Sequence, residues 1–266
     1  MLTLVTDFGA TDEYSGVVKG AALRINPDLT IVDISHAVEP QNISQGARMI
    51  FAAYRYFPEK TIHTCIVDPG VGGNRRIVAL ETRHYRFLAP DNGILTHILD
   101  AESVANVVSV ENPDYFHDTV SATFHGRDIF APVAGHLSRG TPLENLGPVV
   151  PASGMVRLKE PMPKQAADET LTGEVTGCDH FGNLITNIDF QAVQELTGGQ
   201  PRRLSVTVGG KSIRGLADNY ESGAGGEAMA IIGSRGFLEI AVYAKSAAAT
   251  LRVGSQDVVV LRRIDN

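Results

Sequence analysis

The sequence has few cysteines and no long apolar run. Only two cysteines, Cys65 and Cys178, occur in 266 residues, and neither belongs to a C-x-x-C pair or a zinc-type cluster. We therefore expect both to be reduced thiols in the core. No apolar stretch approaches the roughly 18 residues that a membrane-spanning helix needs, which predicts a soluble protein. Residues 1–6 lack the basic segment and cleavage site of a secretory signal, which favours the cytoplasm.

Positive charge is also scarce. The chain carries 23 Lys and Arg against 30 Asp and Glu, a net charge of −7, and it has no run of basic residues. Binding to nucleic acid needs a basic face, so we expect neither a nucleic-acid nor a membrane partner but a small-molecule substrate. The hydrophobic fraction of 43% and the length are typical of a globular protein with one large core or two smaller ones.

The first 150 residues alternate between strand-like and helix-like runs, which predicts an N-terminal α/β layered domain with a mostly parallel sheet. We expect strands at 2–6, 30–34, 61–67, 77–80, 85–88 and 104–110. We expect a first helix with apolar positions at 14, 17, 18, 21 and 25, followed by helices at 44–56, 94–99 and 129–137. Thr11 is the expected cap of the first helix, and Asn26-Pro27 should end it.

A change of composition separates this region from the rest. Five of the thirteen prolines lie between residues 141 and 170, without sustained periodicity, which is typical of a linker. We therefore expect domains at 1–150 and 171–266, joined by a linker at 151–170. The second domain has strand-like runs at 204–208, 228–232, 237–242 and 258–261 and one helix at 190–196, which predicts a small β-barrel or sandwich.

Polar residues gather directly after the expected strands of the first domain. Asp7 follows the first strand, Asp68 opens a Gly-rich loop that runs to Arg76, and Phe124-His-Gly-Arg-Asp128 precedes a helix. Ligands of open α/β sheets bind outside the carboxyl ends of the strands, so these are candidate site residues. Arg75 and Arg76 are adjacent in an extended segment and should point to opposite faces.

Each of these residues also has a structural interpretation. Asp7 could form an Asx-turn, and the loop after Asp68 lacks the Lys-Ser/Thr of a phosphate-binding loop. His125 could be a core histidine, and Asp128 reads as a helix N-cap. In the second domain, turn chemistry could explain the polar residues of 177–183, and surface charge could explain Arg235. Their concentration on loops of both domains favours a ligand held between domains.

Taken together, the segments resemble one family. They are Thr6-Asp-Phe-Gly9, Asp33-Ile-Ser-His36, Val67-Asp-Pro-Gly-Val-Gly72, Ala89-Pro-Asp-Asn-Gly93, Thr123-Phe-His-Gly-Arg-Asp128, Asp179-His-Phe-Gly-Asn183 and Gly233-Ser-Arg-Gly236. The whole chain resembles the S-adenosylmethionine hydroxide adenosyltransferase family, which is related to fluorinase and chlorinase. The resemblance implies an N-terminal α/β domain, a C-terminal β-barrel and a homotrimer with sites at subunit interfaces.

The resemblance also implies roles for individual residues. The hydrolytic triad of the family falls on Asp68, Arg75 and His125, whereas the halogenases have tyrosine at the first and last of these places and serine where Gly126 stands. An additional loop of fluorinase has no counterpart here. The resemblance therefore favours hydrolysis of S-adenosyl-L-methionine by water, which gives adenosine and L-methionine.

Substrate binding is carried over in the same way. Asp7 would hold the ribose hydroxyls, Asp179 the methionine ammonium, Ser234 and Arg235 the methionine carboxylate, and Asn183 the adenine edge. The remaining substrate-binding residues that the resemblance implies are Phe8, Phe124 and Tyr220, the last a candidate for stacking on adenine. The stretch 218–226 is longer than the family pattern, and Tyr243 stands where many relatives have a polar residue.

The implied reaction is an in-line displacement at the ribose 5′ carbon. Water has a pKa of about 15.7, so forming hydroxide at neutral pH costs roughly 12 kcal/mol, more than one arginine supplies. We therefore expect proton removal to accompany attack, with Asp68 and His125 as the base pair and Arg75 orienting the water. No cofactor and no metal is expected, and S-adenosyl-L-methionine is the substrate.

Three other functions remain open from the sequence. A metal-dependent hydrolase of a nucleotide-like substrate could use a set of hard and imidazole ligands, namely Asp7, His36, Asp68, Asp91, His125 and Asp128. A non-catalytic S-adenosylmethionine sensor would need the binding residues but not the triad. A halide-using adenosyltransferase would share Ser234 and Arg235.

Overall fold

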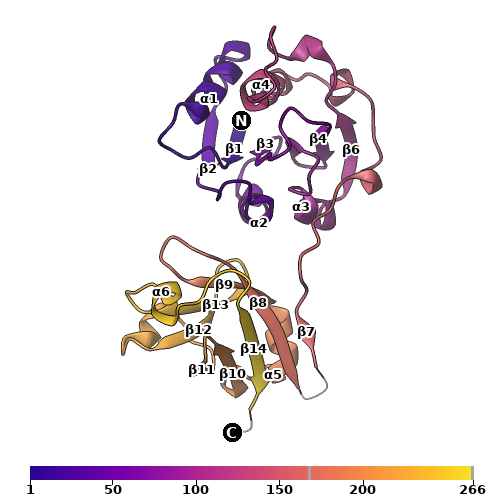
Figure 1. Cartoon of the computed structure of the whole chain (residues 1–266). Coiled ribbons are helices and arrows are strands. Elements are labelled where there is room, and N and C mark those ends of the chain that lie inside the picture. Colours follow the sequence, from indigo (N-terminus) through magenta and orange to yellow (C-terminus); the bar gives the residue numbers. More distant parts are fainter. Residues whose placement is uncertain (167–168, 265–266) are drawn as a thin grey trace. The chain divides into compact units, whose positions relative to one another are not determined.

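The computed structural model describes residues 1–166 and 169–264, and it divides the chain into two compact units (Figure 1). The first unit is Met1–Lys159 and the second is Glu160–Asn266. This division falls within the stretch 151–170 that the sequence marks as a linker. Each unit has a hydrophobic core of its own.

The N-terminal unit is built on a six-stranded sheet with the order β2-β1-β3-β5-β4-β6. Strands β2, β1, β3 and β5 are parallel, whereas β4 runs antiparallel to both β5 and β6. The prediction of a mostly parallel sheet is therefore confirmed. The strands are β1 Leu2–Thr6, β2 Ile31–Ser35, β3 Ile62–Ile66, β4 Ile77–Thr82, β5 Arg86–Pro90 and β6 Val104–Ser109.

Helices cover both faces of this sheet because side chains of a strand alternate between its faces. Leu2 and Leu4 of β1 pack in one core with α1 and α4, whereas Val5 packs in another with α2 and α3 (Figure 1). The helices are α1 Tyr14–Ile25, α2 Ile43–Ala53, α3 Thr96–Ala101, the π-helix η3 Gly126–Phe130 and α4 Ala131–Ser138. Short 3₁₀ turns are η1 Tyr54–Tyr56, η2 Pro113–Tyr115, η4 Leu143–Leu146 and η5 Ala152–Gly154.

Three local predictions are wrong. Thr11 does not cap α1, because residues 10–13 form bends and the N-cap position is Glu13, without a side-chain cap. Asp128 is not an N-cap, because the helix begins earlier as a π-helix and Asp128 lies inside it. Cys65 is buried as predicted, but Cys178 is exposed because it ends a strand where the chain leaves the core.

The C-terminal unit is an antiparallel, barrel-like sheet with the order β11-β10-β14-β8-β9-β13-β12, and β7 pairs with β8. The strands at the two ends of this order lie against each other, and Ala217 N, which follows β11, donates to Ala230 O of β12 at 2.8 Å. The predicted β-barrel is therefore confirmed. The strands are β7 Lys164–Gln165, β8 Thr170–Cys178, β9 Leu184–Asp189, β10 Leu204–Val208, β11 Lys211–Arg214, β12 Ala228–Ile232, β13 Phe237–Val242 and β14 Val258–Arg263.

In the described part of this unit, 160–166 and 169–264, two helices and two 3₁₀ turns accompany the strands. They are α5 Phe190–Thr197, α6 Ala247–Leu251, η6 Pro201–Arg203 and η7 Tyr220–Gly223. Asp189 caps α5 by accepting a hydrogen bond from Ala192 N, and Gly198 ends it in the left-handed conformation. Among the described residues, no helix has the length and apolar character needed to cross a bilayer.

Candidate active site

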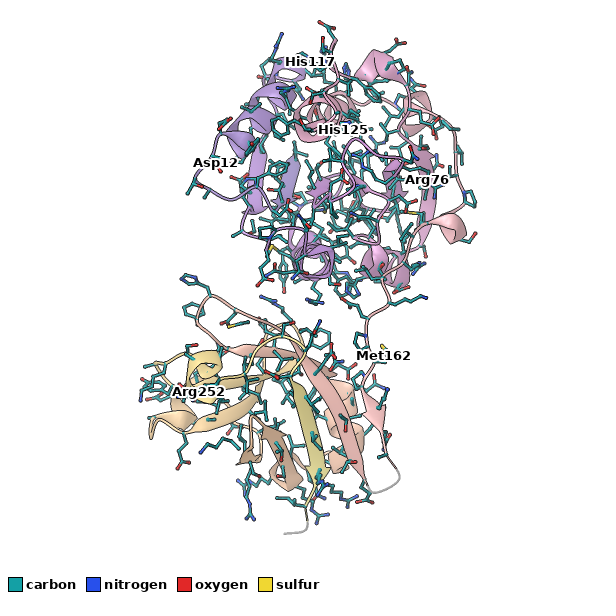
Figure 2. All side chains as sticks on the ribbon, in the orientation of Figure 1. Asp12, Arg76, His117, His125, Met162 and Arg252 are labelled. Atoms are coloured by element: carbon teal, nitrogen blue, oxygen red, sulfur yellow. The ribbon has the colours of Figure 1, made fainter. Side chains whose placement is uncertain are left out.

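Asp68, Arg75 and His125 come from three places in the N-terminal sequence and meet in one hydrogen-bonded cluster, the triad. Asp68 follows β3, Arg75 precedes β4, and His125 lies at the start of η3, in the N-terminal unit of Figure 2. Arg75 Nε donates to Asp68 Oδ1 at 3.0 Å and Oδ2 at 2.9 Å, and Arg75 Nη2 donates to Asp68 Oδ2 at 2.5 Å. Arg75 Nη2 also lies 2.8 Å from His125 Nδ1.

The triad is partly shielded from water. The Asp68 side chain is 5% exposed and the Arg75 side chain 12% exposed. Shielding strengthens the attraction between the carboxylate and the guanidinium, because less solvent screens the two charges. The fork of Arg75 holds the plane of the Asp68 carboxylate in one orientation.

The contact between Arg75 and His125 sets the tautomer of the imidazole. A guanidinium has donors only, so His125 Nδ1 must accept and the neutral ring carries its proton on Nε2. The pKa of His125 is lowered by burial and then by the charge of Arg75, although the charges of Asp68 and Asp128 and a hydrogen bond with the Ser121 backbone oppose this. His125 is therefore an Nε2–H donor in this arrangement.

The loop between Asp68 and Arg75 lies close to the segment that leads to His125. Gly72 has a φ of +75°, and a Cβ atom there would lie 2.1 Å from Ala122 O. Only glycine permits both this backbone conformation and this approach. Glycine at position 72 is thus required for the loop after Asp68 to pack against the segment that leads to His125.

The neighbouring arginine points to other partners, as expected for adjacent residues of an extended segment. Arg76 Nε and Nη2 donate to Asp91 Oδ2 at 3.0 and 2.5 Å, and Arg76 Nη2 donates to Gly154 O at 2.8 Å. Asp91 Oδ1 accepts from Val156 N at 2.9 Å. These contacts anchor the segment that carries Arg75.

Asp128 supports the segment that carries His125. Its carboxylate is fully buried and accepts from Ser121 N at 2.8 Å and from Arg127 Nε and Nη2 at 2.6 and 3.0 Å. Burial raises the pKa of Asp128, but hydrogen bonds from Arg127 and Ser121 outweigh it and bring the pKa to about 2. Asp128 is therefore ionised, and its hydrogen bonds hold the 121–128 segment in place.

An aromatic cluster in the same unit includes two residues that the resemblance assigns to substrate. Phe8 and Phe124 have ring centroids 6.0 Å apart, and Tyr14 packs edge-on against Phe124 at 5.2 Å. Tyr14 is 43% exposed and escaped the sequence prediction because its place in the helical apolar pattern explained it. Asp7 lies after β1, and its Oδ2 accepts from Gln41 N at 2.9 Å.

In the C-terminal unit, Asp179 organises the turn that follows β8. Its Oδ1 accepts from Phe181 N at 2.9 Å and Asn183 N at 2.8 Å, and its Oδ2 accepts from Asn183 Nδ2 at 2.9 Å. This is the turn chemistry that the structural interpretation expected. It also leaves the carbonyl oxygen and the second N–H of the Asn183 amide unused by Asp179.

Ser234 and Arg235 lie in a tight turn between β12 and β13. Gly236 N donates to Gly233 O, and Gly233 N donates to Phe237 O, both at 2.9 Å. Tyr220, which is 45% exposed, donates from its hydroxyl to Glu239 Oε2 at 3.3 Å. Glu239 was missed from the sequence because it stands in an otherwise apolar run that reads only as a strand.

The potential metal ligands do not gather. Within residues 1–166 and 169–264, no three His, Cys, Asp or Glu side chains are grouped to hold a metal ion. Three of the carboxylates are instead paired with arginine, in the pairs Asp68–Arg75, Asp91–Arg76 and Asp128–Arg127. His36 Nδ1 lies 2.8 Å from Thr6 Oγ1, and His36 Nε2 lies 3.0 Å from Asp33 Oδ1.

Comparison with known proteins gives the family. The model of the SAM hydroxide adenosyltransferase N-terminal domain matches residues 2–147, and that of the C-terminal domain matches residues 173–260. An (R)-S-adenosyl-L-methionine hydrolase of Salinispora tropica is 36% identical over 96% of this chain and 95% of its own length. A fluorinase of Nocardia brasiliensis is 32% identical, covering 93% of this chain and 92% of its own.

The fold has the same relatives. A crystal structure of an uncharacterized conserved protein from Thermotoga maritima matches with a TM-score of 0.91 and 37% identity, over 99% of this chain and all of the other. Both family models and full-length relatives above 30% identity therefore agree with the motifs and the two-unit architecture. The chain belongs to the SAM hydroxide adenosyltransferase family.

Proposed function

We propose that this enzyme hydrolyses S-adenosyl-L-methionine to adenosine and L-methionine. The observation that carries the proposal is the hydrogen-bonded set of Asp68, Arg75 and His125, which has the groups needed to hold and deprotonate a water molecule. The similarity to a protein named (R)-S-adenosyl-L-methionine hydrolase supports the same reaction.

The reaction balances without a co-reactant other than water. The water oxygen bonds to the ribose 5′ carbon while the bond from that carbon to sulfur breaks, and its electron pair goes to sulfur. The sulfonium becomes the neutral thioether of methionine, so the leaving group needs no acid. The difficult part is the proton that the water must lose.

The hydrogen bonds of the triad define the proposed roles. Three N–H groups of Arg75, on Nε and Nη2, are directed at Asp68 and His125, which leaves the two on Nη1 for the water. Asp68 receives the proton, and His125 donates its Nε2–H to the oxygen. His125 shares the base role only if Arg75 releases Nδ1.

The remaining residues would bind the substrate. We assign the ribose diol to Asp7, with Phe8 and Phe124 beside it. Asp179 takes the ammonium group of the methionine part, because an ionised carboxylate is its natural partner. The other assignments are the methionine carboxylate to Ser234 and Arg235, the adenine edge to Asn183 and the adenine face to Tyr220.

The decisive experiment uses water labelled with heavy oxygen. The purified protein is incubated with each sulfonium epimer of S-adenosyl-L-methionine, because the name of the hydrolase relative specifies one configuration. We expect adenosine with heavy oxygen at the 5′ hydroxyl. Recovery of intact substrate would support a sensor instead, loss of turnover on chelation a metal-dependent hydrolase, and a 5′-halogenated product with added halide a halogenase.

A matched variant tests the role of Asp68. Asp68→Asn keeps the shape of the side chain and removes the proton acceptor, so adenosine formation should fall about 10²- to 10⁴-fold. Substrate affinity, measured by calorimetry, should stay within a few-fold of the wild type. Unchanged turnover would remove Asp68 from the mechanism.

We also infer the setting in which the enzyme works. The family resemblance supports a homotrimer, with sites at subunit interfaces, and light scattering should then give three times the chain mass of 28.5 kDa. Fractionation of cells should place the protein in the cytoplasm. The reaction as written uses no metal and no cofactor, so activity should survive exhaustive chelation.

A further inference from the structure

Glu239 is a buried carboxylate for which the proposed mechanism has no use. It lies in β13, which is otherwise apolar, and is only 6% exposed. On the same strand, Leu238 and Ile240 are fully buried in the core of the C-terminal unit. Burying a carboxylate costs free energy that an apolar side chain at this position would not cost.

Two elements with predicted substrate residues meet at this carboxylate. Its Oε2 accepts the hydrogen bond from the Tyr220 hydroxyl at 3.3 Å. Its Oε1 lies against the backbone of Gly233, since a Cβ atom there would be 1.9 Å from Oε1. Gly233 begins the turn that carries Ser234 and Arg235.

The charges around Glu239 belong to the same set of residues. Burial raises the pKa of Glu239, and the charge of Asp179 raises it further. The hydrogen bond from Tyr220 and the charge of Arg235 act in the opposite direction. Of the residues assigned to the substrate, Tyr220 therefore contacts Glu239 directly, and Asp179 and Arg235 act on it through their charges.

We propose that Glu239 is a positioning residue for the substrate site, holding the phenol of Tyr220 and the turn of Ser234 and Arg235 in one fixed arrangement. The proposal rests on the proposed function, because the substrate defines the site. Glu239 itself touches no reacting atom. It restricts the side-chain rotation of Tyr220 and sets how closely the Gly233–Gly236 turn approaches β13.

This role predicts that Glu239 affects KM and leaves kcat nearly unchanged. Without the carboxylate, Tyr220 loses its hydrogen-bond acceptor and the turn loses the group packed on Gly233. The binding energy lost should correspond to one hydrogen bond to a charged group, which raises KM about tenfold or more. The triad lies in the N-terminal unit, so kcat should stay within about threefold.

The test compares three variants in the full-length enzyme. We expect Glu239→Ala to raise KM about tenfold. Glu239→Gln keeps the shape and an acceptor oxygen, so its KM should stay within about threefold of the wild type. Tyr220→Phe should also raise KM, and the KM of the double variant should be no higher than that of the more impaired single variant.

Two further variants separate positioning from general destabilisation. Gly233→Ala should displace the carboxylate and raise KM, but in a Glu239→Ala background it should add nothing, because the colliding group is gone. Glu195→Ala, on the exposed face of α5, is the control for loss of a surface carboxylate and should leave KM unchanged.

The outcomes distinguish this proposal from the proposed function. If the wild-type protein fails to form adenosine, the proposed function is wrong. If the wild-type protein is active and Glu239→Ala keeps its KM, the positioning role is wrong. Multiplicative effects of Glu239→Ala and Tyr220→Phe would also overturn it, because two side chains that act through one hydrogen bond cannot lose it twice.

Discussion

The fork of Arg75 can be tested by a substitution that keeps its charge. In Arg75→Lys, one ammonium group replaces the planar guanidinium that now contacts both Asp68 and His125. A lysine is a point donor and cannot reproduce the fork. We expect the charge pairing with Asp68 to survive, whereas the orientation of His125 and the Nη1 donors are lost.

The magnitude follows from these contacts. Removing a preorganised donor to a developing oxyanion typically lowers kcat about 10²- to 10³-fold, or about 2.7–4 kcal/mol in the transition state. One or two charge-assisted hydrogen bonds of the folded state are lost, each contributing about 1.5–3 kcal/mol, but Asp68 does not become an unpaired buried charge. In a unit of this size, each kcal/mol lowers Tm by about 2–4 °C, so the variant should remain folded at 25 °C.

The assay is steady-state adenosine formation, together with thermal unfolding of each protein. Arg76→Lys is the matched control, because Arg76 also pairs with a carboxylate, Asp91, but faces away from the triad. It should lower Tm by a similar amount and leave kcat within about threefold. If Arg75→Lys also keeps kcat within threefold, or changes only KM, Arg75 does not contact the reacting oxygen and the assignment is refuted.

Three other predictions concern pH and packing. Burial, followed by the charge of Arg75, lowers the pKa of His125, so the neutral ring should persist and the acidic limb of the kcat profile should have its midpoint below pH 6.5; a midpoint above that value would contradict the tautomer. Burial lowers the pKa of His63 to about 3, so below pH 6.5 the unfolded state binds more protons than the folded state. The free energy of unfolding should therefore decrease as the pH is lowered from 6.5 to about 3, by up to ~1.4 kcal/mol per pH unit. Urea unfolding of His63→Phe should show a flatter dependence. Gly72→Ala places a Cβ against Ala122 O and should lower both Tm and kcat, whereas an unchanged kcat would uncouple this loop from the triad.

The N-terminal fold was predictable because its signals are local and strong. The run 2–6 is β1 as expected, and helix α1 contains the predicted apolar positions from Tyr14 to Ile25, although it begins two residues later than a cap at Thr11 implies. Parallel strands buried on both faces appear in the sequence as apolar runs, and the amphipathic helices between them show apolar residues at helical spacing. Polar residues after such strands then meet at one edge of the sheet, which is why the position of Asp68 alone predicts a site residue.

The antiparallel unit gave weaker signals. The sequence does not give ranges for β8 and β9, because Gly173 and Gly177 interrupt the first and the second, Leu184–Asp189, lacks a regular alternation of apolar and polar residues. Helix α6 has only five residues, too short for a periodic pattern. For the same reason Cys178 was wrongly assigned to the core, since the end of β8 was not visible in the sequence.

Side-chain partners outside the motifs also escaped prediction. Glu239 could be chosen only after the register of β12 with β13 brought the Gly233 turn against it. Asp128 is a second case: its place in the sequence predicts a helix N-cap, but it lies inside the π-helix and pairs with Arg127. Residue type and position predict where charge is placed, but the partner of that charge depends on packing between segments distant in sequence.

The charges of the triad finally bear on the timing of proton transfer. Asp68 is an anion, Arg75 a cation and His125 neutral, so the cluster as a whole carries no net charge. The triad by itself therefore adds little stabilisation to free hydroxide before the reaction, because the guanidinium is already neutralised by Asp68. Asp68 can accept the proton only as the water attacks, when the sulfonium is losing its charge. The geometry therefore favours attack concerted with deprotonation, and it predicts a normal solvent deuterium isotope effect on kcat, whereas attack by a preformed hydroxide moves no proton in the transition state and predicts a small or inverse one.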